Sequence, residues 1–295
     1  KGSFRYIETP HQALKEVQRA LNRYLQAVYY CERTPVAYGF TLNALFDAPR
    51  NILTNAQQHL GKPFLLNIAL KSYFHQISSK TVFRLFQKKP FHFNSKIAST
   101  LTRLTTYKGR LPMGTSTSPV MSNFASRALD KALLNFSQQK GWTFTRYVDD
   151  LSFSSDKPIS HRDINRAVRV IHSHHFRVNH QKVRLYLPED LKEVTGLLVG
   201  EQQVQLPKRF IEDTYQEITE LRDAIALVCR YGKYADDWVD RLQQRIQGRI
   251  NFVGFVLSKK SEEYKQLKTA FLQACVPPVD FVPISWSDFS YPNFS

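Results

Sequence analysis

The stretch Thr143–Ser155, TFTRYVDDLSFSS, decides the fold because two adjacent carboxylates interrupt a segment that otherwise has the residues of a β-sheet. Aspartate is disfavoured in strands, and the neighbouring charges of Asp149 and Asp150 repel each other. A tight turn is one interpretation, since aspartate adopts turn geometry readily. The other is a hairpin that presents carboxylates to Mg²⁺, which prefers oxygen ligands and often acts in pairs roughly 3.5–4 Å apart. The Tyr-x-Asp-Asp motif alone is too short to choose between them.

The composition favours a polyanionic partner. The 295 residues are 42% hydrophobic, enough for one large domain or two moderate ones. The 41 Lys+Arg exceed the 25 Asp+Glu, which gives a net charge of +16 and a pI near 9.8. Such an excess is typical of proteins that bind nucleic acid, although a basic surface that only maintains solubility gives the same composition.

The cysteines and the apolar runs indicate a compartment. Cys31, Cys229 and Cys275 are far apart, odd in number and without the spacing of a metal site, which predicts a reducing cytoplasm. No apolar run reaches the roughly 18–20 residues of a membrane span, and no signal peptide is recognisable. We therefore expect a protein of the bacterial cytoplasm with no membrane partner. Since the sequence does not begin with Met, we expect residues to be missing before Lys1.

The hydrophobic pattern predicts strands and helices in a mixed order. We expect a strand at 1–9, a helix at 12–30, a buried strand at 63–70, an amphipathic helix at 120–141, the hairpin around Asp149 and mostly helix from about residue 209. A loop rich in Gly, Pro, Ser and Thr covers 108–119. This order predicts an α+β fold with an antiparallel sheet backed by helices, the carboxylates at one end of the sheet and a helical C-terminal unit.

Four further motifs accompany the hairpin motif RYVDDLSFS. Apart from the stretch LNIALKSYF at 66–74, they are KGSFRYIETPHQALKEVQRAL at 1–21, GFTLNALFDAPRNILTNAQQH at 39–59, LPMGTSTSP at 111–119 followed by SNFASRALD, and EVTGLLV at 193–199. In this order they resemble reverse transcriptases, and among these the bacterial retron type, over nearly the whole chain. The resemblance implies a right-hand polymerase fold. Residues 1–62 would form the fingers, 63–80 the first part of the palm, 81–110 helices of fingers and palm, 111–204 the palm with the hairpin, and 205–295 the thumb and a C-terminal RNA-binding region.

The resemblance implies a catalytic site that holds two Mg²⁺ ions, with Asp149 as the principal ligand and Asp150 as the second. The family's first palm strand is close to L-N-I-D-L-x-x-F-F, so its first catalytic aspartate falls on Ala69. The backbone carbonyl of Leu70 would add a contact to the nucleotide-bound metal. Asn67 lies on the same strand face as Ala69 and is a possible replacement, but the aromatic pair at 73–74 sets the register on Ala69.

Alanine cannot ligate a metal ion, so we expect this chain to be nearly inactive. Two origins of Ala69 stay open: a substitution introduced to inactivate an enzyme, and a naturally defective palm.

The resemblance also implies a site for deoxynucleoside triphosphates. Phe74 would exclude the ribose 2′-hydroxyl, and Tyr147 would support the primer end. The Met113–Gly114 loop would contact the incoming nucleotide. Lys1 and Arg5 would bind the triphosphate, for which the guanidinium of Arg suits bidentate contact. Lys182 would protonate pyrophosphate. Each of these three is equally compatible with an ordinary surface residue.

The implied partners are a structured noncoding RNA, its RNA–DNA product and a defence effector protein. Candidate nucleic-acid contacts are Asn55, His59 and Thr195 in the retron-type motifs, and Arg245, Arg249 and Lys259 near the aromatic residues of the C-terminal region. The implied function is RNA-directed synthesis of branched multicopy single-stranded DNA for anti-phage defence. The alternatives are a related defence-associated reverse transcriptase and a naturally non-catalytic RNA-binding scaffold.

Overall fold

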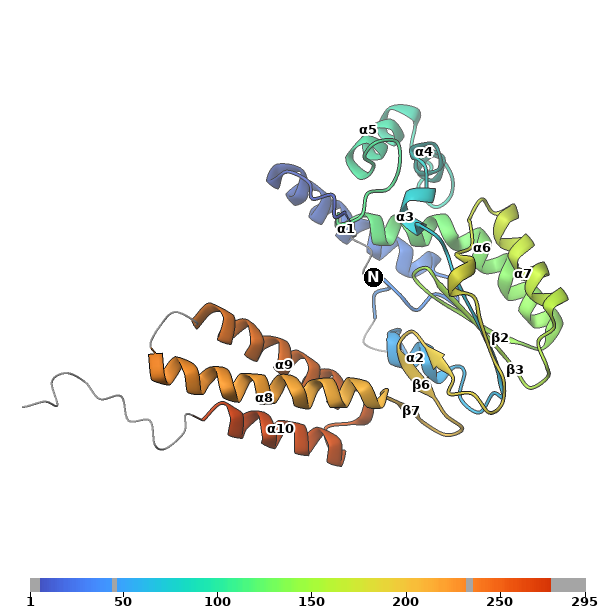
Figure 1. Cartoon of the computed structure of the whole chain (residues 1–295). Coiled ribbons are helices and arrows are strands. Elements are labelled where there is room, and N and C mark those ends of the chain that lie inside the picture. The colour runs from blue at the N-terminus through green and yellow to red at the C-terminus, as the bar shows by residue number, and fades with distance from the viewer. Residues whose placement is uncertain (1–5, 44–46, 232–235, 277–295) are drawn as a thin grey trace, which may run out of the picture. The chain divides into compact units, whose positions relative to one another are not determined.

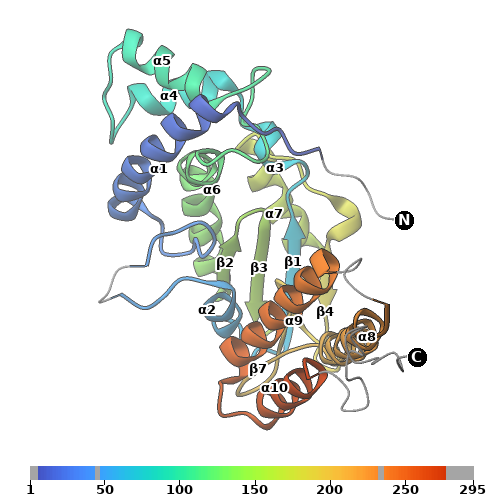
Figure 2. The ribbon, with the colours of Figure 1, turned by 90° about the vertical axis from the view of Figure 1, so that its left-hand side faces the viewer.

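The computed structural model describes residues 6–43, 47–231 and 236–276 (Figures 1 and 2). The chain divides into two compact units, residues 1–203 and 204–295, and each is described separately. Lys1 and Arg5, the predicted triphosphate ligands, lie outside the described residues. Among the helices of the described ranges, none combines the length and the apolar character that a membrane span requires.

A four-stranded antiparallel sheet forms the centre of the first unit. Its order is β2 (Thr143–Tyr147), β3 (Asp150–Ser155), β1 (Phe64–Ala69) and β4 (Arg184–Tyr186), which Figure 2 shows side by side. Because side chains alternate across a strand, Phe144, Phe153 and Leu66 share one face, while Thr145, Ser152 and Asn67 share the other. The sheet therefore has an apolar face and a polar face.

Helices cover both faces of this sheet. The apolar face packs on α6 (Ser118–Lys140) and α7 (His161–Ser173), and α2 (Ile52–Gln57) lies on the opposite side (Figure 1). Helix α6 begins with Pro119 in its first turn and ends at Gly141, whose φ of +67° suits a residue without a side chain. The other elements of this unit are α1 (Gln12–Glu32), α3 (Tyr73–Gln76), α4 (Ser79–Gln87), α5 (Ser95–Thr105), the 3₁₀ turn η1 (His180–Lys182), and the hairpin β5 (Glu193–Val194) and β6 (Leu197–Val199).

In its described residues, the second unit contains the short strand β7 (Val204–Gln205) and three helices. These are α8 (Lys208–Tyr231), α9 (Asp236–Leu257) and α10 (Glu262–Ala274), which pack against one another. Buried Leu221, Ile246, Ile250 and Leu267 form part of its core. A Cβ on Gly254 would come within 2.7 Å of the Tyr264 ring, so α9 and α10 approach closely because this residue is glycine.

The predicted fold class is confirmed: the protein is α+β, with an antiparallel sheet backed by helices and a helical C-terminal unit. One predicted element is absent from the described part of the chain. Residues 6–9, within the expected N-terminal strand, have no regular secondary structure and form one backbone hydrogen bond, from Glu8 N to Met113 O at 2.7 Å. The alternating pattern therefore does not make a strand of residues 6–9.

Candidate active site

The two carboxylates lie at the tip of the β2–β3 hairpin. Val148 occupies the turn with a φ of +59°, a conformation that is strained for a β-branched residue. Asp149 follows it and Asp150 begins β3, with the Asp150 side chain exposed. The backbone N–H of Leu70 donates to the carbonyl of Asp149 at 2.8 Å, which fixes the turn against the end of β1. Strand pairing thus holds the acidic pair at the edge of the polar face.

Ala69 lies directly opposite Asp150 in the β1–β3 pairing. Opposite residues in an antiparallel pair have Cβ atoms about 4.5–5.5 Å apart and point to the same face. An aspartate at position 69 would therefore extend over the same surface as Asp150. As it stands, the described part of the chain contains no group of three or more His, Cys, Asp and Glu side chains able to hold a metal ion. The donor set does not fit a complete two-metal centre.

Asn67 does not replace the missing carboxylate. Its amide Nδ2 donates to the carbonyl of Glu193 at 2.6 Å, and its Oδ1 accepts from the hydroxyl of Ser152 at 2.9 Å. Both ends of the side chain are engaged in joining β1 to β3 and to the β5 strand. These hydrogen bonds therefore do not support Asn67 as a replacement metal ligand.

A polar cleft of about 450 Å³ opens in front of Ala69. It brings together several predicted site residues that are distant in the sequence. Among them, Tyr147 has a pKa raised by burial, so its hydroxyl stays protonated. The lining residues are Ile52, Asn67, Ile68, Ala69, Tyr147, Asp150, Ser152, Lys182, Arg184, Tyr186, Glu193, Thr195 and Gly196. Polar groups and cations beside an acidic turn suit a nucleic-acid end with its phosphates.

Phe74, Met113 and Gly114 lie outside the residues that line this cleft. Phe74 is half-buried in α3, and its ring centroid lies 6.3 Å from that of Phe40. Gly114 has a φ of +113°, and a Cβ there would come within 2.5 Å of Ile7 Cγ2. The loop that carries Met113 therefore passes directly under the N-terminal segment.

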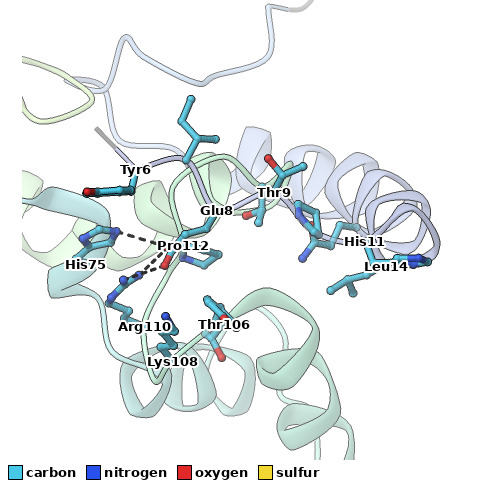
Figure 3. Close-up of a pocket in the computed structure, with 15 residues that line it drawn as sticks. Tyr6, Glu8, Thr9, His11, Leu14, His75, Thr106, Lys108, Arg110 and Pro112 are labelled. Atoms are coloured by element: carbon cyan, nitrogen blue, oxygen red, sulfur yellow. Dashed lines mark hydrogen bonds and ion pairs between the residues drawn. The ribbon is translucent and has the colours of Figure 1, made fainter. Parts of the chain in front are cut away.

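A second cleft, of about 720 Å³, lies between the N-terminal segment, α1 and the loop at 106–112 (Figure 3). Figure 3 shows Glu8 between Arg110 and His75. The Arg110 guanidinium donates to both carboxylate oxygens of Glu8, at 2.8 and 3.0 Å, and lowers the pKa of that carboxyl. His75 Nε2 lies 3.7 Å from Glu8 Oε2. This bidentate pair links the N-terminal segment to the Met113 loop.

His59 is buried, which corrects its prediction as an RNA contact. The side chain is 1% exposed, and its ring nitrogens lie 2.7 Å from Ser154 Oγ and 2.8 Å from Thr145 Oγ1. Burial lowers its pKa to about 3, so the ring is neutral and clamps the segment after α2 to the polar face. Asn55 is also 1% exposed, so its amide is not accessible to a nucleic acid. Thr195, in contrast, lines the cleft.

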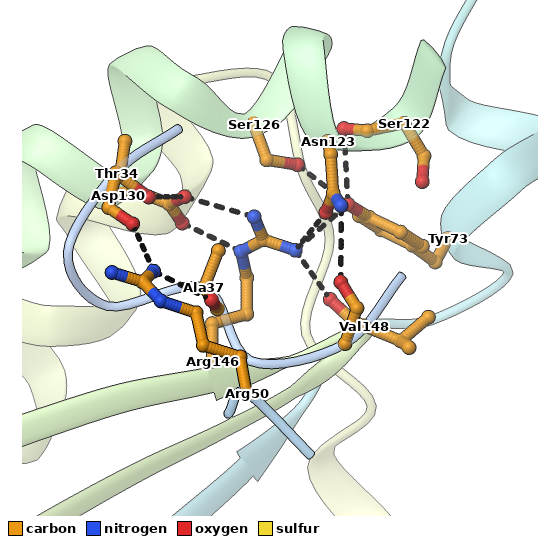
Figure 4. A network of polar contacts seen from close by, with 11 residues as sticks. Thr34, Ala37, Arg50, Tyr73, Ser122, Asn123, Ser126, Asp130, Arg146 and Val148 are labelled. Atoms are coloured by element: carbon orange, nitrogen blue, oxygen red, sulfur yellow. Dashed lines mark hydrogen bonds and ion pairs between the residues drawn. The ribbon is translucent and has the colours of Figure 1, made fainter. Parts of the chain in front are cut away.

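A buried cluster below the turn was not predicted. Arg146 and Asp130 are both 0% exposed, and Arg146 Nε and Nη2 donate to the Asp130 oxygens at 2.6 and 2.8 Å (Figure 4). Nη1 lies 3.1 Å from Asn123 Oδ1, 3.1 Å from the Val148 carbonyl and 3.3 Å from the Tyr73 hydroxyl. We name Arg146, Asp130, Asn123 and Tyr73 the Arg146 cluster. It joins α6 and α3 to the turn that carries the carboxylates.

Arg146 stays positively charged inside this cluster. Burial alone would lower the pKa of Arg146, but the Asp130 carboxylate and the hydrogen bonds outweigh it, and the pKa lies above its ordinary value. A sequence signal for the cluster exists, since strand alternation places Arg146 on the same face as Phe144, inside the core. A charge at such a position requires a buried partner, although its identity is not local.

In the second unit, Arg249 contacts its own helical bundle. Its guanidinium donates to Thr214 Oγ1 at 2.9 Å and to the Phe210 carbonyl at 3.2 Å, and it lies 4.5 Å from the Phe210 ring centroid. The Arg249 side chain is 23% exposed, and its contact with RNA stays a prediction. Arg245 is 58% exposed beside Glu217, and Lys259 is exposed, so both stay candidates for phosphate contact.

The profile described as reverse transcriptase (RNA-dependent DNA polymerase) matches residues 1–257. The chain belongs to the reverse transcriptase family. It is 28% identical over 222 residues to the retron Ec86 reverse transcriptase of Escherichia coli, covering 74% of this chain and 65% of that protein. It is 32% identical over 231 residues to the retron Mx162 reverse transcriptase of Myxococcus xanthus, covering 68% and 45%. The resemblance to retron-type enzymes is confirmed, and the chain spans less than two thirds of the length of these relatives.

Among solved structures, apo telomerase from Candida tropicalis matches 88% of this chain and 54% of its own, with a TM-score of 0.48 and 11% sequence identity.

Proposed function

We propose that this reverse transcriptase chain is the RNA-directed DNA polymerase of a retron, and that Ala69 disables its chemistry. The observation that carries the proposal is the pairing of Ala69 with Asp150 at the hairpin tip, beside a polar cleft. The backbone bond from Leu70 N to the Asp149 carbonyl holds the acidic turn against the end of the strand that carries Ala69. With an aspartate at position 69, Asp149 and Asp150 would complete a set of carboxylates for two Mg²⁺ ions, which would activate the attacking hydroxyl and neutralise the leaving group.

The proposed substrate contacts involve residues of the cleft and residues outside its lining. Phe74 selects deoxynucleoside triphosphates, the Met113–Gly114 loop contacts the incoming nucleotide, and Tyr147 supports the primer end. Lys182, which is exposed at the cleft, protonates pyrophosphate. The template is a structured noncoding RNA, and the product is branched multicopy single-stranded DNA that acts in anti-phage defence with an effector protein.

The second unit acts as the thumb. Arg245 and Lys259 carry exposed cations on its helices and provide phosphate contacts to an RNA–DNA hybrid. Thr195, at the mouth of the cleft, contacts nucleic acid near the primer end.

The test compares the chain with its Ala69→Asp variant for Mg²⁺-dependent incorporation of deoxynucleotides on its cognate noncoding RNA. We expect the variant to be faster by roughly 10³-fold, because metal stabilisation of the transition state is worth several kcal/mol. Ala69→Asn is the matched control, since it has the size of aspartate without the charge. Adding Asp149→Asn to Ala69→Asp should abolish the gained activity.

A non-catalytic RNA-binding scaffold is the second candidate. The observation that favours it is the lack of a three-ligand acidic group among the described residues. Mn²⁺ titration followed by electron paramagnetic resonance separates the two candidates. Tight Mn²⁺ binding that appears only with Ala69→Asp supports the polymerase. RNA binding without any gain in metal affinity or synthesis supports the scaffold.

A further inference from the structure

Tyr73 adds a hydroxyl where the family motif has the first of two phenylalanines. The side chain is 4% exposed, and its hydroxyl lies 2.6 Å from Ser126 Oγ, 3.1 Å from the Ser122 carbonyl and 3.3 Å from Arg146 Nη1 (Figure 4). Burial raises its pKa, so the hydroxyl stays protonated and donates to α6 while it accepts from the guanidinium. Tyr73 is thus tied to the residues that hold the catalytic turn.

The helix that carries Tyr73 has little stability of its own. Helix α3 has only four residues, starts from Ser72 with a φ of +47°, and has no side-chain cap. Such a short helix depends on tertiary contacts, because one turn does not repay the cost of nucleation. Those contacts are the stacking of Tyr73 on Phe176, with centroids 5.7 Å apart, and the hydroxyl in the Arg146 cluster.

Phe74 is the next residue of the same helix, and the cluster reaches it from a second side. Asn123 Nδ2 donates to the carbonyls of Gly39 and Phe40 at 3.0 and 3.2 Å. The Phe40 ring, in turn, lies 6.3 Å from the Phe74 ring. Arg146 Nη1 contacts both Asn123 and the Val148 carbonyl. The placement of Phe74 is therefore coupled to the turn that carries the carboxylates.

We propose that Tyr73 is a positioning residue that sets the location of Phe74 relative to the catalytic turn, and so determines how strictly deoxynucleotides are chosen over ribonucleotides. This inference rests on the proposed function of the site. Loss of the hydroxyl leaves the ring and its stacking in place but releases the start of α3. Phe74 then yields more easily to a 2′-hydroxyl.

The activity test uses the Ala69→Asp chain with and without Tyr73→Phe. Single-turnover kcat/KM is measured for a matched deoxynucleotide and ribonucleotide on the same primer and template. We expect the ratio of the two to fall about fivefold, the effect of one buried neutral hydrogen bond. General destabilisation would lower both values together and leave the ratio unchanged. An unchanged ratio in an active enzyme would overturn the inference.

Tyr29→Phe is the matched control. Tyr29 is 0% exposed in the same core, and its hydroxyl makes none of the hydrogen bonds to Ser122, Ser126 and Arg146 that the Tyr73 hydroxyl makes. Its replacement should leave the ratio unchanged, and a change as large as that of Tyr73→Phe would also overturn the inference.

A second measurement needs no catalysis and uses the chain as it is. Hydrogen–deuterium exchange of the amides of Gln76 and Ile77, which donate to Ser72 and Phe74, should accelerate in Tyr73→Phe and not in Tyr29→Phe. Unchanged exchange would overturn this inference alone. An inactive Ala69→Asp chain would instead overturn the proposed function, and the claim about nucleotide choice with it.

Discussion

Replacement of Asp130 by asparagine would remove the charge that balances Arg146 with little change in shape. Both side chains are 0% exposed, and the carboxylate accepts from Arg146 at 2.6 and 2.8 Å and from Thr34 Oγ1 at 2.7 Å. The asparagine amide would place a donor against a guanidinium that also only donates. Breaking a buried ion pair costs about 3–5 kcal/mol, since one charge is left uncompensated. That is a large part of the roughly 5–15 kcal/mol that stabilises a folded protein.

Urea unfolding measures this loss. Trp142 is 8% exposed in the first unit and packs against Phe153, so its fluorescence reports on that core. Replacing Trp238 and Trp286 with phenylalanine leaves Trp142 as the one tryptophan of the chain, since the sequence has three. The matched control is Thr34→Val, which removes one hydrogen bond to the same carboxylate and should cost about 1 kcal/mol.

The double variant Asp130→Asn with Arg146→Met removes the unpaired charge and should recover part of the loss. The reasoning is refuted if Asp130→Asn costs no more than Thr34→Val, or if the double variant is as unstable as the sum of the single ones.

Three other predictions concern stability and binding. The pKa of His59 is about 3 in the folded protein and 6.5 ordinarily, so the neutral ring stabilises the fold fully above pH 6.5. This stabilisation declines as the pH falls from 6.5 toward 3. Between pH 7 and pH 5, the free energy of unfolding from urea titrations should fall by about 2 kcal/mol more in this chain than in His59→Gln. Gly39→Ala would place a Cβ 2.7 Å from Val148 Cγ2 and should cost about 1–3 kcal/mol, partly recovered by adding Val148→Ala, and full additivity would contradict the contact. Arg249→Ala should lower the melting temperature of the C-terminal helices, because it removes the bond to Thr214. Lys259→Ala should leave the melting temperature unchanged and reduce the salt dependence of RNA binding by about one ion. A shift in melting temperature for Lys259→Ala would contradict its role as an exposed phosphate contact.

The hairpin and its register were predictable because they depend on local pattern. Alternation along 143–155 places the strands, and the structure pairs Ala69 with Asp150. That position 69 is the family's first catalytic position stays a prediction, which the aromatic pair at 73–74 carries. The partners of buried polar groups were not predictable in the same way. Asn67 bonds to a carbonyl 126 residues away, and Arg146 meets an acid from a different helix. Such pairs follow from how elements pack, which spacing along one element does not encode.

His59 illustrates the same limit. The resemblance of residues 39–59 to a retron-type segment suggested an RNA contact at His59, and two hydroxyls on neighbouring strands instead bind its ring inside the protein. Thr145 and Ser154 carry the signal in the sequence, because they place hydroxyls on the polar face of the sheet. That signal becomes readable only when α2 is known to lie over the same face.

The pairing of Ala69 with Asp150 also has a genetic meaning. Codons for alanine and aspartate share the first base and differ at the middle one, and aspartate also requires a pyrimidine at the third position. A gene with GCU or GCC at position 69 would therefore encode aspartate opposite Asp150 after one base change, whereas GCA or GCG would give glutamate.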